Sequence, residues 1–251
     1  CNFRPGVIEM NLTPESIQEN YQRVLDRVEI AQSQAHYPHP VEIIVVSKGQ
    51  LSEVIQMAYQ VGIRKFGENY PDETLRKIPD LSTLFNLEWH MIGHLQSRKV
   101  PIVSQYFHAM HSIDRVEIAR KISNRMMENG KTMMALLEMN VSGEESKYGF
   151  PAHDPEHWET LIPIIDEIID LPGISVQGLM TMPPFFDDPE KARPYFVQLI
   201  RVRDYLAGRF QKIDWHHISM GTSVDFEIAI QEGATMVRIG QAILGPRPVR
   251  Q

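Results

Sequence analysis

Near the start of the chain, apolar residues recur at helical spacing. They are Ile17, Tyr21, Val24, Leu25 and Val28. Intervals of three and four residues place such side chains on one face of a helix. Thr13 and Pro14 precede this stripe, as a hydroxyl N-cap and a proline at the first helical position. The pattern therefore predicts a helix over residues 13–34.

After this helix, short β-branched runs alternate with segments of helical period. The predicted strands are residues 41–46, 63–66, 87–92, 109–113, 134–141, 175–180, 216–220 and 235–239. The predicted helices between them include residues 52–61, 116–129, 157–169, 189–209 and 224–233. Strands that alternate with helices are typical of a parallel sheet built from βαβ units. Eight such units in about 200 residues favour a closed (β/α)8 TIM barrel over an open doubly wound sheet.

The α/β pattern continues without interruption, so we predict one barrel domain over residues 13–251. No Gly/Ser-rich linker and no block of charge divides the chain. Few residues follow the last predicted strand, and the helix over residues 13–34 is expected to fill the gap that this leaves in the outer ring. Residues 1–12 are interpreted as a leader or tail, while a lipidated Cys1 of a mature lipoprotein stays open as an alternative.

Composition narrows the class of protein. Lys and Arg number 25 and Asp and Glu 32, so the net charge is −7, which gives no footprint for nucleic acid or an anionic membrane. Apolar residues make up 43% of the chain, enough for a core, but no run is long enough to span a bilayer. A single cysteine excludes an internal disulfide framework and a zinc site built on several thiolates. We expect a cytoplasmic protein.

Polar side chains and glycines gather at the carboxyl ends of the predicted strands, where barrels of this kind carry their active sites. Lys48 ends the first apolar strand, and a lysine there is costly to desolvate unless it has a partner or a function. Arg238 lies between Val237 and Ile239, so strand alternation points it to the opposite side, toward the barrel interior. A buried arginine is rare without a partner.

Six ordered strings at these strand ends carry a family resemblance. They are Val46-Ser47-Lys48, Phe66-Gly67-Glu68-Asn69, Glu88-Trp89-His90 with Ile92-Gly93-His94-Leu95-Gln96-Ser97, Gly178-Leu179-Met180, Ser219-Met220-Gly221 and Met236-Val237-Arg238-Ile239-Gly240. Together they resemble the YggS/PROSC family of pyridoxal phosphate homeostasis proteins, single barrels similar to the N-terminal domain of alanine racemase. The match runs from about Thr13 to Arg247. It implies pyridoxal 5'-phosphate (PLP) as the cofactor.

The resemblance implies that Lys48 forms a Schiff base with PLP and that Arg238 faces the pyridine nitrogen. Arginine offers only donors, so this nitrogen would stay unprotonated and the cofactor would be a weaker electron sink. The nearest rival among the lysines is Lys147, which we interpret as a loop residue near the barrel mouth. For Arg238, a purely structural ion pair stays open.

The resemblance also implies a phosphate site where the seventh and eighth predicted strands end. Ser219 offers a hydroxyl, Gly221 begins a turn into a helix, and Gly240 permits close backbone approach. The family usually has Thr or Ser directly after this last glycine. Gln241 stands there instead, so its backbone N–H is the expected donor.

Asn69 and His90 are assigned to the cofactor with an alternative. Asn69 is predicted to contact the ring oxygen of PLP and His90 its ring face, but both also fit ordinary barrel positions. The spacing of the histidines predicts no metal site.

The resulting hypothesis is a PLP-binding protein that acts in cofactor and amino-acid homeostasis without strong turnover, so no catalytic residue is assigned. A PLP-dependent amino-acid racemase is the alternative, although it needs a base on each face of the substrate and we expect no second domain to supply one. A partner-binding module without cofactor is a third. Expected partners are the cofactor and, as an open alternative, free amino acids, with the chain a monomer or weak dimer.

Overall fold

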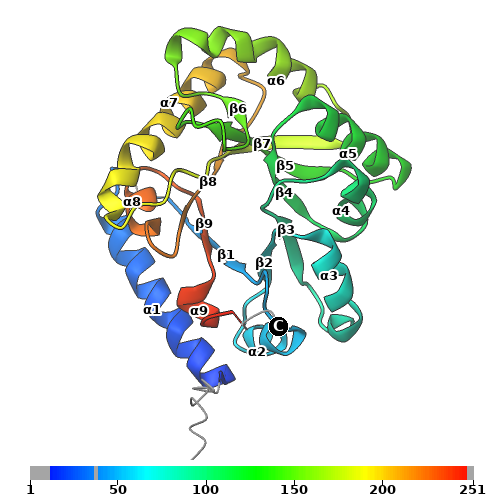
Figure 1. Cartoon of the computed structure of the whole chain (residues 1–251), viewed down its shortest axis with the longest axis vertical. Coiled ribbons are helices and arrows are strands. Elements are labelled where there is room, and N and C mark those ends of the chain that lie inside the picture. The colour runs from blue at the N-terminus through cyan, green and yellow to red at the C-terminus, as the bar shows by residue number, and fades with distance from the viewer. Residues whose placement is uncertain (1–11, 37–38, 248–251) are drawn as a thin grey trace, which may run out of the picture.

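The computed structural model describes residues 12–36 and 39–247, and in it eight parallel strands close into a barrel (Figure 1). The strands are β1 Glu42–Val46, β2 Lys65–Glu68, β3 Glu88–Met91, β4 Ala109–Ile113, β5 Met133–Asn140, β7 Ile174–Met180, β8 His217–Thr222 and β9 Met236–Ile239. They pair in this order, and β9 pairs with β1 to close the ring. The predicted (β/α)8 barrel and all eight predicted strands are confirmed, with ends shifted by one or two residues.

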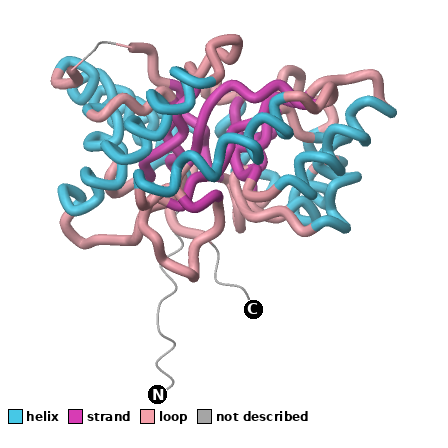
Figure 2. The backbone as a smooth tube through the Cα atoms, turned by 90° about the horizontal axis from the view of Figure 1, so that it is seen from above, coloured by secondary structure: helices cyan, strands magenta, loops and turns pink. Residues whose placement is uncertain are grey.

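Helices surround the strands on the outside of the ring, as Figures 1 and 2 show from two directions. They are α1 Pro14–Ser33, α2 Ser52–Gln60, α3 Pro71–Lys77, α4 Val100–Tyr106, α5 Val116–Glu128, α6 Ile162–Ile169, α7 Arg193–Arg209, α8 Phe226–Gln231 and α9 Gln241–Leu244. Segments of 3₁₀ helix, Pro155–Leu161 and Pro189–Ala192, precede α6 and α7, where the sequence pattern predicts continuous helices over residues 157–169 and 189–209.

The N-terminal helix fills the ring as predicted. Thr13 caps α1 by accepting a hydrogen bond from the Ser16 backbone N–H, and the Ser16 hydroxyl accepts one from the Thr13 N–H in return. Its buried stripe, which includes Ile17 and Val24, packs against α2, α8 and α9, beside the last strand. The interpretation of residues 1–12 falls almost entirely outside the described residues.

Several short elements have no counterpart in the prediction, among them α3, α4, α9 and the two-residue strand β6, Phe150–Pro151, which pairs with β5. Each helix among them has at most seven residues, too few for a clear apolar period. In the described part of the chain, no helix has the length and apolar character that crossing a membrane requires.

Apolar side chains fill the barrel interior on the amino-terminal side of Glu138 and Arg238. Leu136, Met180 and Met236 form a buried cluster of their own, separate from the larger core between the barrel and its helices. Because side chains two residues apart share a face of a strand, Glu138 and Arg238 follow this cluster on the same interior face. The interior therefore turns from apolar to charged toward the carboxyl ends of the strands.

Candidate functional site

A cavity of about 200 Å³ opens at the carboxyl ends of β1, β8 and β9, and we name it the Lys48 cavity. Its walls are Val46, Lys48, Asn69, Ile92, Met182, Thr222, Ser223, Arg238, Gly240, Gln241 and Arg247. Five of the eight residues predicted to bind the cofactor are among them: Lys48, Asn69, Arg238, Gly240 and Gln241. The walls carry three cationic side chains and no carboxylate, in a chain whose net charge is −7. The cavity therefore suits an anionic ligand.

Lys48 has an amine that is more readily deprotonated than an ordinary lysine amine. Burial lowers the pKa of Lys48, and the positive charges of Arg247 and Arg238 lower it further. The negative charges of Glu68 and Glu73 act in the opposite direction with smaller effect. A lowered pKa raises the neutral fraction of the amine near pH 7, and the neutral amine is the nucleophile.

A buried ion cluster holds the backbone on both sides of Lys48. Lys77 lies between Glu68 and Glu73, with its Nζ 2.7 Å from one oxygen of each carboxylate. Nζ also donates to the Ser47 carbonyl at 3.0 Å, and the Ser47 hydroxyl donates to Glu68 at 2.7 Å. On the other side, the Gly49 N–H donates to Glu73 at 2.5 Å. Residues 47 and 49 are thus anchored, and Lys48 projects from a fixed strand end.

Arg238 is buried, with 3% of its surface exposed, and its guanidinium is held by three acceptors. One nitrogen donates to the Ser219 hydroxyl at 2.6 Å, and the other to the Thr181 carbonyl at 2.8 Å and the Met182 sulfur at 3.0 Å. Burial lowers the pKa of Arg238 to about 10, which still leaves it protonated at neutral pH. No carboxylate accepts from it among the described residues, so a simple structural ion pair does not account for its burial.

A chain of buried hydrogen bonds leads away from Arg238 through the barrel interior. The Ser219 hydroxyl lies 2.9 Å from Nδ1 of His111, and Nε2 of His111 lies 2.9 Å from Nδ1 of His90. Burial, with the charges of His90 and Arg238, lowers the pKa of His111 well below its usual value, so this ring is neutral. His90 thus reaches Ser219 only through His111, and it does not line the Lys48 cavity.

Arg238 sets the direction of this chain. Because the guanidinium only donates, the Ser219 oxygen accepts from it, and its own proton is free to go to Nδ1 of His111. His111 then carries its proton on Nε2 and donates to Nδ1 of His90. Nε2 of His90 is buried without a hydrogen-bond partner, 3.8 Å from a Glu88 oxygen. This assignment gives the Ser219 proton an acceptor, which the reverse direction does not.

Of the other residues predicted to bind the cofactor, Asn69 and Gly240 line the Lys48 cavity, whereas Gly221 packs behind its wall. The Oδ1 atom of Asn69 is buried without a hydrogen-bond partner, so the wall offers an unused polar group. Gly240 lies against β1, where a Cβ would stand 3.0 Å from the Val46 carbonyl oxygen. Gly221 does not line the cavity. Its φ is +89°, and a Cβ there would lie 2.6 Å from the Cβ of Ala229, so this glycine allows α8 to pack against β8.

Sequence reasoning missed Arg247 as a wall residue, and it placed Thr222 and Ser223 in the turn at the phosphate site without assigning a contact to either. Ser223 accepts a hydrogen bond from the Gly240 N–H at 3.3 Å, while Thr222 donates through both its N–H and its hydroxyl to Asp225. Both belong to the turn Gly221-Thr222-Ser223, which the sequence places at the phosphate site. Arg247 lies beyond the last strand, where no periodic pattern indicated that the chain returns to the mouth.

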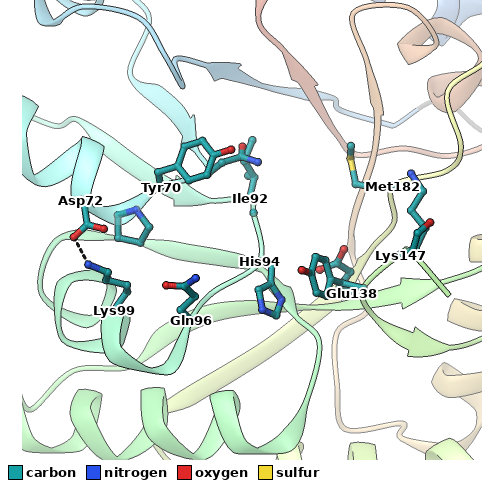
Figure 3. A pocket seen from close by; sticks show the side chains of 14 residues that line it. Tyr70, Asp72, Ile92, His94, Gln96, Lys99, Glu138, Lys147 and Met182 are labelled. Atoms are coloured by element: carbon teal, nitrogen blue, oxygen red, sulfur yellow. Dashed lines mark hydrogen bonds and ion pairs between the residues drawn. The ribbon is translucent and has the colours of Figure 1, made fainter. Parts of the chain in front are cut away.

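A second, larger space of about 460 Å³ adjoins the Lys48 cavity, and we name it the Glu138 chamber (Figure 3). The two spaces share Asn69, Ile92 and Met182 as wall residues. Lys147 lines the chamber and not the Lys48 cavity, and its Nζ donates to the Pro183 carbonyl at 3.5 Å. The two lysines considered from the sequence thus lie in neighbouring spaces.

Comparison with known proteins finds the same fold and related sequences. The family described as alanine racemase, N-terminal domain, matches residues 16–248. A pyridoxal phosphate homeostasis protein of Aquifex aeolicus is 40% identical over 230 residues, which cover 91% of this chain and 97% of that protein. The likeness therefore spans nearly the full length of both.

Solved structures agree. PipY of Synechococcus elongatus PCC7942, in a structure with PLP bound, matches with a TM-score of 0.78 and 27% identity, covering 91% of this chain and 100% of that chain. An alanine racemase of Clostridium difficile 630 matches with a TM-score of 0.65 and 17% identity, covering 92% of this chain and 57% of that chain. The racemase likeness concerns the fold alone.

Proposed function

This chain belongs to the family of pyridoxal phosphate homeostasis proteins, and we propose that it holds PLP on Lys48 and gives it up again, rather than using it to turn over a substrate. One observation carries the proposal: a lysine of lowered pKa stands in a cavity with two arginines and no acid. PLP is an anion that carries an aldehyde, and these walls match both properties. The PLP-bound structure of PipY, a similar protein, supports the same ligand.

Lys48 is the proposed attachment point. When bound, PLP supplies an aldehyde that condenses with a primary amine to a Schiff base. Lys48 provides the amine, partly neutral because of its burial and its two arginine neighbours. The anchored Ser47 and Gly49 keep this amine in the cavity, which lowers the entropy lost on bonding.

We assign the phosphate to the side of the cavity formed by Ser223, Gly240, Gln241 and Arg247. The first turn of α9 begins at Gln241, and the N–H groups that open a helix have no partner within it. Arg247 adds a positive charge, and Ser223 a hydroxyl. Gln241 needs only its backbone N–H for this role, so the absence of a Thr or Ser side chain there does not remove the site.

Arg238 is assigned to the pyridine nitrogen, opposite the phosphate. Its guanidinium is held from behind by Ser219 and Thr181, and it remains a donor at neutral pH. A ring nitrogen that accepts from arginine stays unprotonated and stabilises a carbanion poorly. This supports storage and delivery of the cofactor over racemisation. The single cysteine of the sequence fits work in the reducing cytoplasm.

The proposal is tested with the purified chain, PLP and heavy water. We expect PLP to give the chain a visible absorption that survives gel filtration. When the PLP-loaded chain is dialysed against a PLP-requiring apoenzyme, we expect the activity of that enzyme to be restored. L-alanine and L-serine incubated with the loaded chain in heavy water should gain no deuterium at Cα at enzymatic rates. Absence of the absorption would refute PLP binding, whereas rapid deuterium uptake would establish the racemase alternative.

Replacing His111 by leucine should weaken PLP binding through Arg238. The Ser219 hydroxyl would lose the acceptor that directs its proton away from the guanidinium, and an unpaired buried hydroxyl costs about 1–3 kcal/mol. We therefore expect a higher Kd for PLP and a shifted absorption maximum of the bound cofactor. Ser123→Ala is the matched control, since Ser123 is also buried and bonded, to the Gly173 N–H outside the barrel. Equal spectra of the His111 variant and the unmodified chain would contradict this role.

A further inference from the structure

Glu138 is a buried carboxyl group without a partner. It lies on β5 with 7% of its surface exposed, yet no hydrogen bond or ion pair joins its side chain to any residue within 12–36 or 39–247. Glu68, which is fully buried, has both Lys77 and Ser47 as partners. Neither Glu138 oxygen is among the fully buried side-chain atoms that lack a partner, and Glu138 lines the Glu138 chamber, so its carboxyl group is open to that space. A ligand that donates to this carboxyl would therefore supply the partner that the protein does not.

The surroundings of Glu138 bring the pKa of its carboxyl group close to neutral pH. Burial raises the pKa of Glu138 to about 7, helped by the negative charge of Asp114 and opposed by the positive charges of Arg238 and Lys147. Asp114 itself is occupied, because it pairs with His94 at 2.5 Å and with Arg115 at 2.6 Å. His94 is stacked on Tyr148 at 3.8 Å between ring centres. Lys147 lines the same chamber and its charge acts on Glu138, but its Nζ donates to the Pro183 carbonyl and forms no ion pair with Glu138 in the described residues.

The Glu138 chamber offers room for a ligand next to this acid (Figure 3). Its volume of about 460 Å³ exceeds that of the Lys48 cavity, and the two spaces meet at Asn69, Ile92 and Met182. A ligand bound at Glu138 would thus lie beside whatever Lys48 holds. An ionised carboxylate in such a wall is satisfied best by a charged N–H donor, because charge-assisted hydrogen bonds are the strongest available to it.

We propose that the Glu138 chamber binds a small primary amine, whose ammonium group pairs with the Glu138 carboxylate. The chamber shares Asn69, Ile92 and Met182 with the Lys48 cavity, so an amine bound there would lie next to that cavity. Resting on the proposed function, the ammonium group would give one proton to Glu138, and the neutral amine nitrogen would replace the Lys48 nitrogen on the aldehyde carbon of PLP. The C–N bond to Lys48 would break, and the Lys48 nitrogen would take up the two N–H protons that the incoming amine loses. Amine availability would in this way regulate cofactor release.

Binding is measured by calorimetry on the full-length chain, first without PLP, using L-alanine, ethylamine and propionate. The two amines should bind and propionate, which lacks the ammonium, should not bind in a Glu138-dependent manner. Glu138→Gln should weaken both amines by about tenfold or more, the loss expected for one charged hydrogen bond. Equal affinities of L-alanine and ethylamine would identify simple amines as sufficient, and tighter alanine binding would identify amino acids as the ligand class. Unchanged amine affinity in Glu138→Gln would overturn the proposal.

The pH dependence and a matched variant separate this role from a structural one. Glu138 is charged only above about pH 7, so amine affinity should fall between pH 8 and pH 5.5 and should not do so in Glu138→Gln. A raised pKa also means that stability is lost as pH rises through it, so Glu138→Gln should unfold at a higher temperature than the unmodified chain at pH 8. Glu145→Gln makes the same charge change at an exposed loop position and should alter neither quantity.

PLP uptake is followed separately by visible absorption. A chain that takes up PLP but shows no amine binding dependent on Glu138 contradicts this inference and leaves the proposed function intact. A chain that binds amines through Glu138 but takes up no PLP supports the amine site and refutes the proposed function.

Discussion

Lys48→Ala is expected to abolish the covalent retention of PLP. The variant keeps Arg238, Arg247 and the phosphate donors, so it should still bind PLP weakly and reversibly, but without the bond that survives gel filtration. Borohydride reduction of the loaded, unmodified chain, followed by peptide mass spectrometry, should find the label on the peptide that contains Lys48. The expectation follows from the lowered pKa of Lys48 and its place in the cationic cavity.

Lys147→Ala is the control for this experiment. Lys147 lines the neighbouring Glu138 chamber, so its variant should retain the visible absorption and the label on Lys48. Label on Lys147 in the unmodified chain, or a Lys48→Ala variant that still carries reducible PLP after gel filtration, would contradict the assignment.

Lys77→Met should cause the largest loss of stability of any substitution considered. Lys77 is buried with 5% exposure and its amine is the shared partner of Glu68 and Glu73. Removing one member of a buried ion cluster leaves uncompensated charge, which typically costs about 3–5 kcal/mol. We expect this loss in urea unfolding at pH 8, together with weaker PLP binding, because Ser47 loses the lysine that anchors its carbonyl.

The pH dependence of this loss has a definite sign. Burial already raises the pKa of Glu68 above its ordinary value of 4.5, while Lys77 acts to lower it. Without Lys77 the folded-state pKa of Glu68 must rise further, so folding binds a proton and stability falls as pH rises through that pKa. The difference from the unmodified chain should therefore shrink at pH 5. Lys121→Met, at an exposed position of α5, should change stability by less than about 0.5 kcal/mol, and an equally small effect of Lys77→Met would refute the cluster's role.

The barrel was predictable because its signals are local. Each strand is a short apolar run bounded by polar or glycine residues. A regular apolar stripe and the Thr13 N-cap predict α1, and the structure confirms both the helix and its cap. Missed elements such as α3, α4, α9 and β6 are short and are stabilised by contacts across the fold rather than by their own pattern. For α3, that contact is the ion cluster of Lys77 beneath Lys48.

For the candidate site, the sequence indicated which residues lie at the ends of strands, but not which of them line the Lys48 cavity and which lie behind it. Lys48, Asn69, Arg238, Gly240 and Gln241 lie in one cavity, as a barrel requires of side chains at neighbouring strand ends. Ser219 and His90, also assigned to the cofactor, instead lie behind Arg238 in a buried hydrogen-bond chain that includes His111. Strand alternation indicates which face a side chain takes, but not how far along the barrel axis it reaches.

The sequence by itself determined the eight-stranded barrel, its capping N-terminal helix and the end of the barrel that carries the chemistry, because periodicity and strand order depend on neighbours in the chain. The tertiary structure alone decided which charges meet. Arg247 joins Lys48 from 199 positions away in the chain (247 − 48 = 199), Lys77 neutralises two acids on different elements, and Glu138 is left without a partner. Charge pairing and burial depend on distances in space, and these exist only once the barrel has closed.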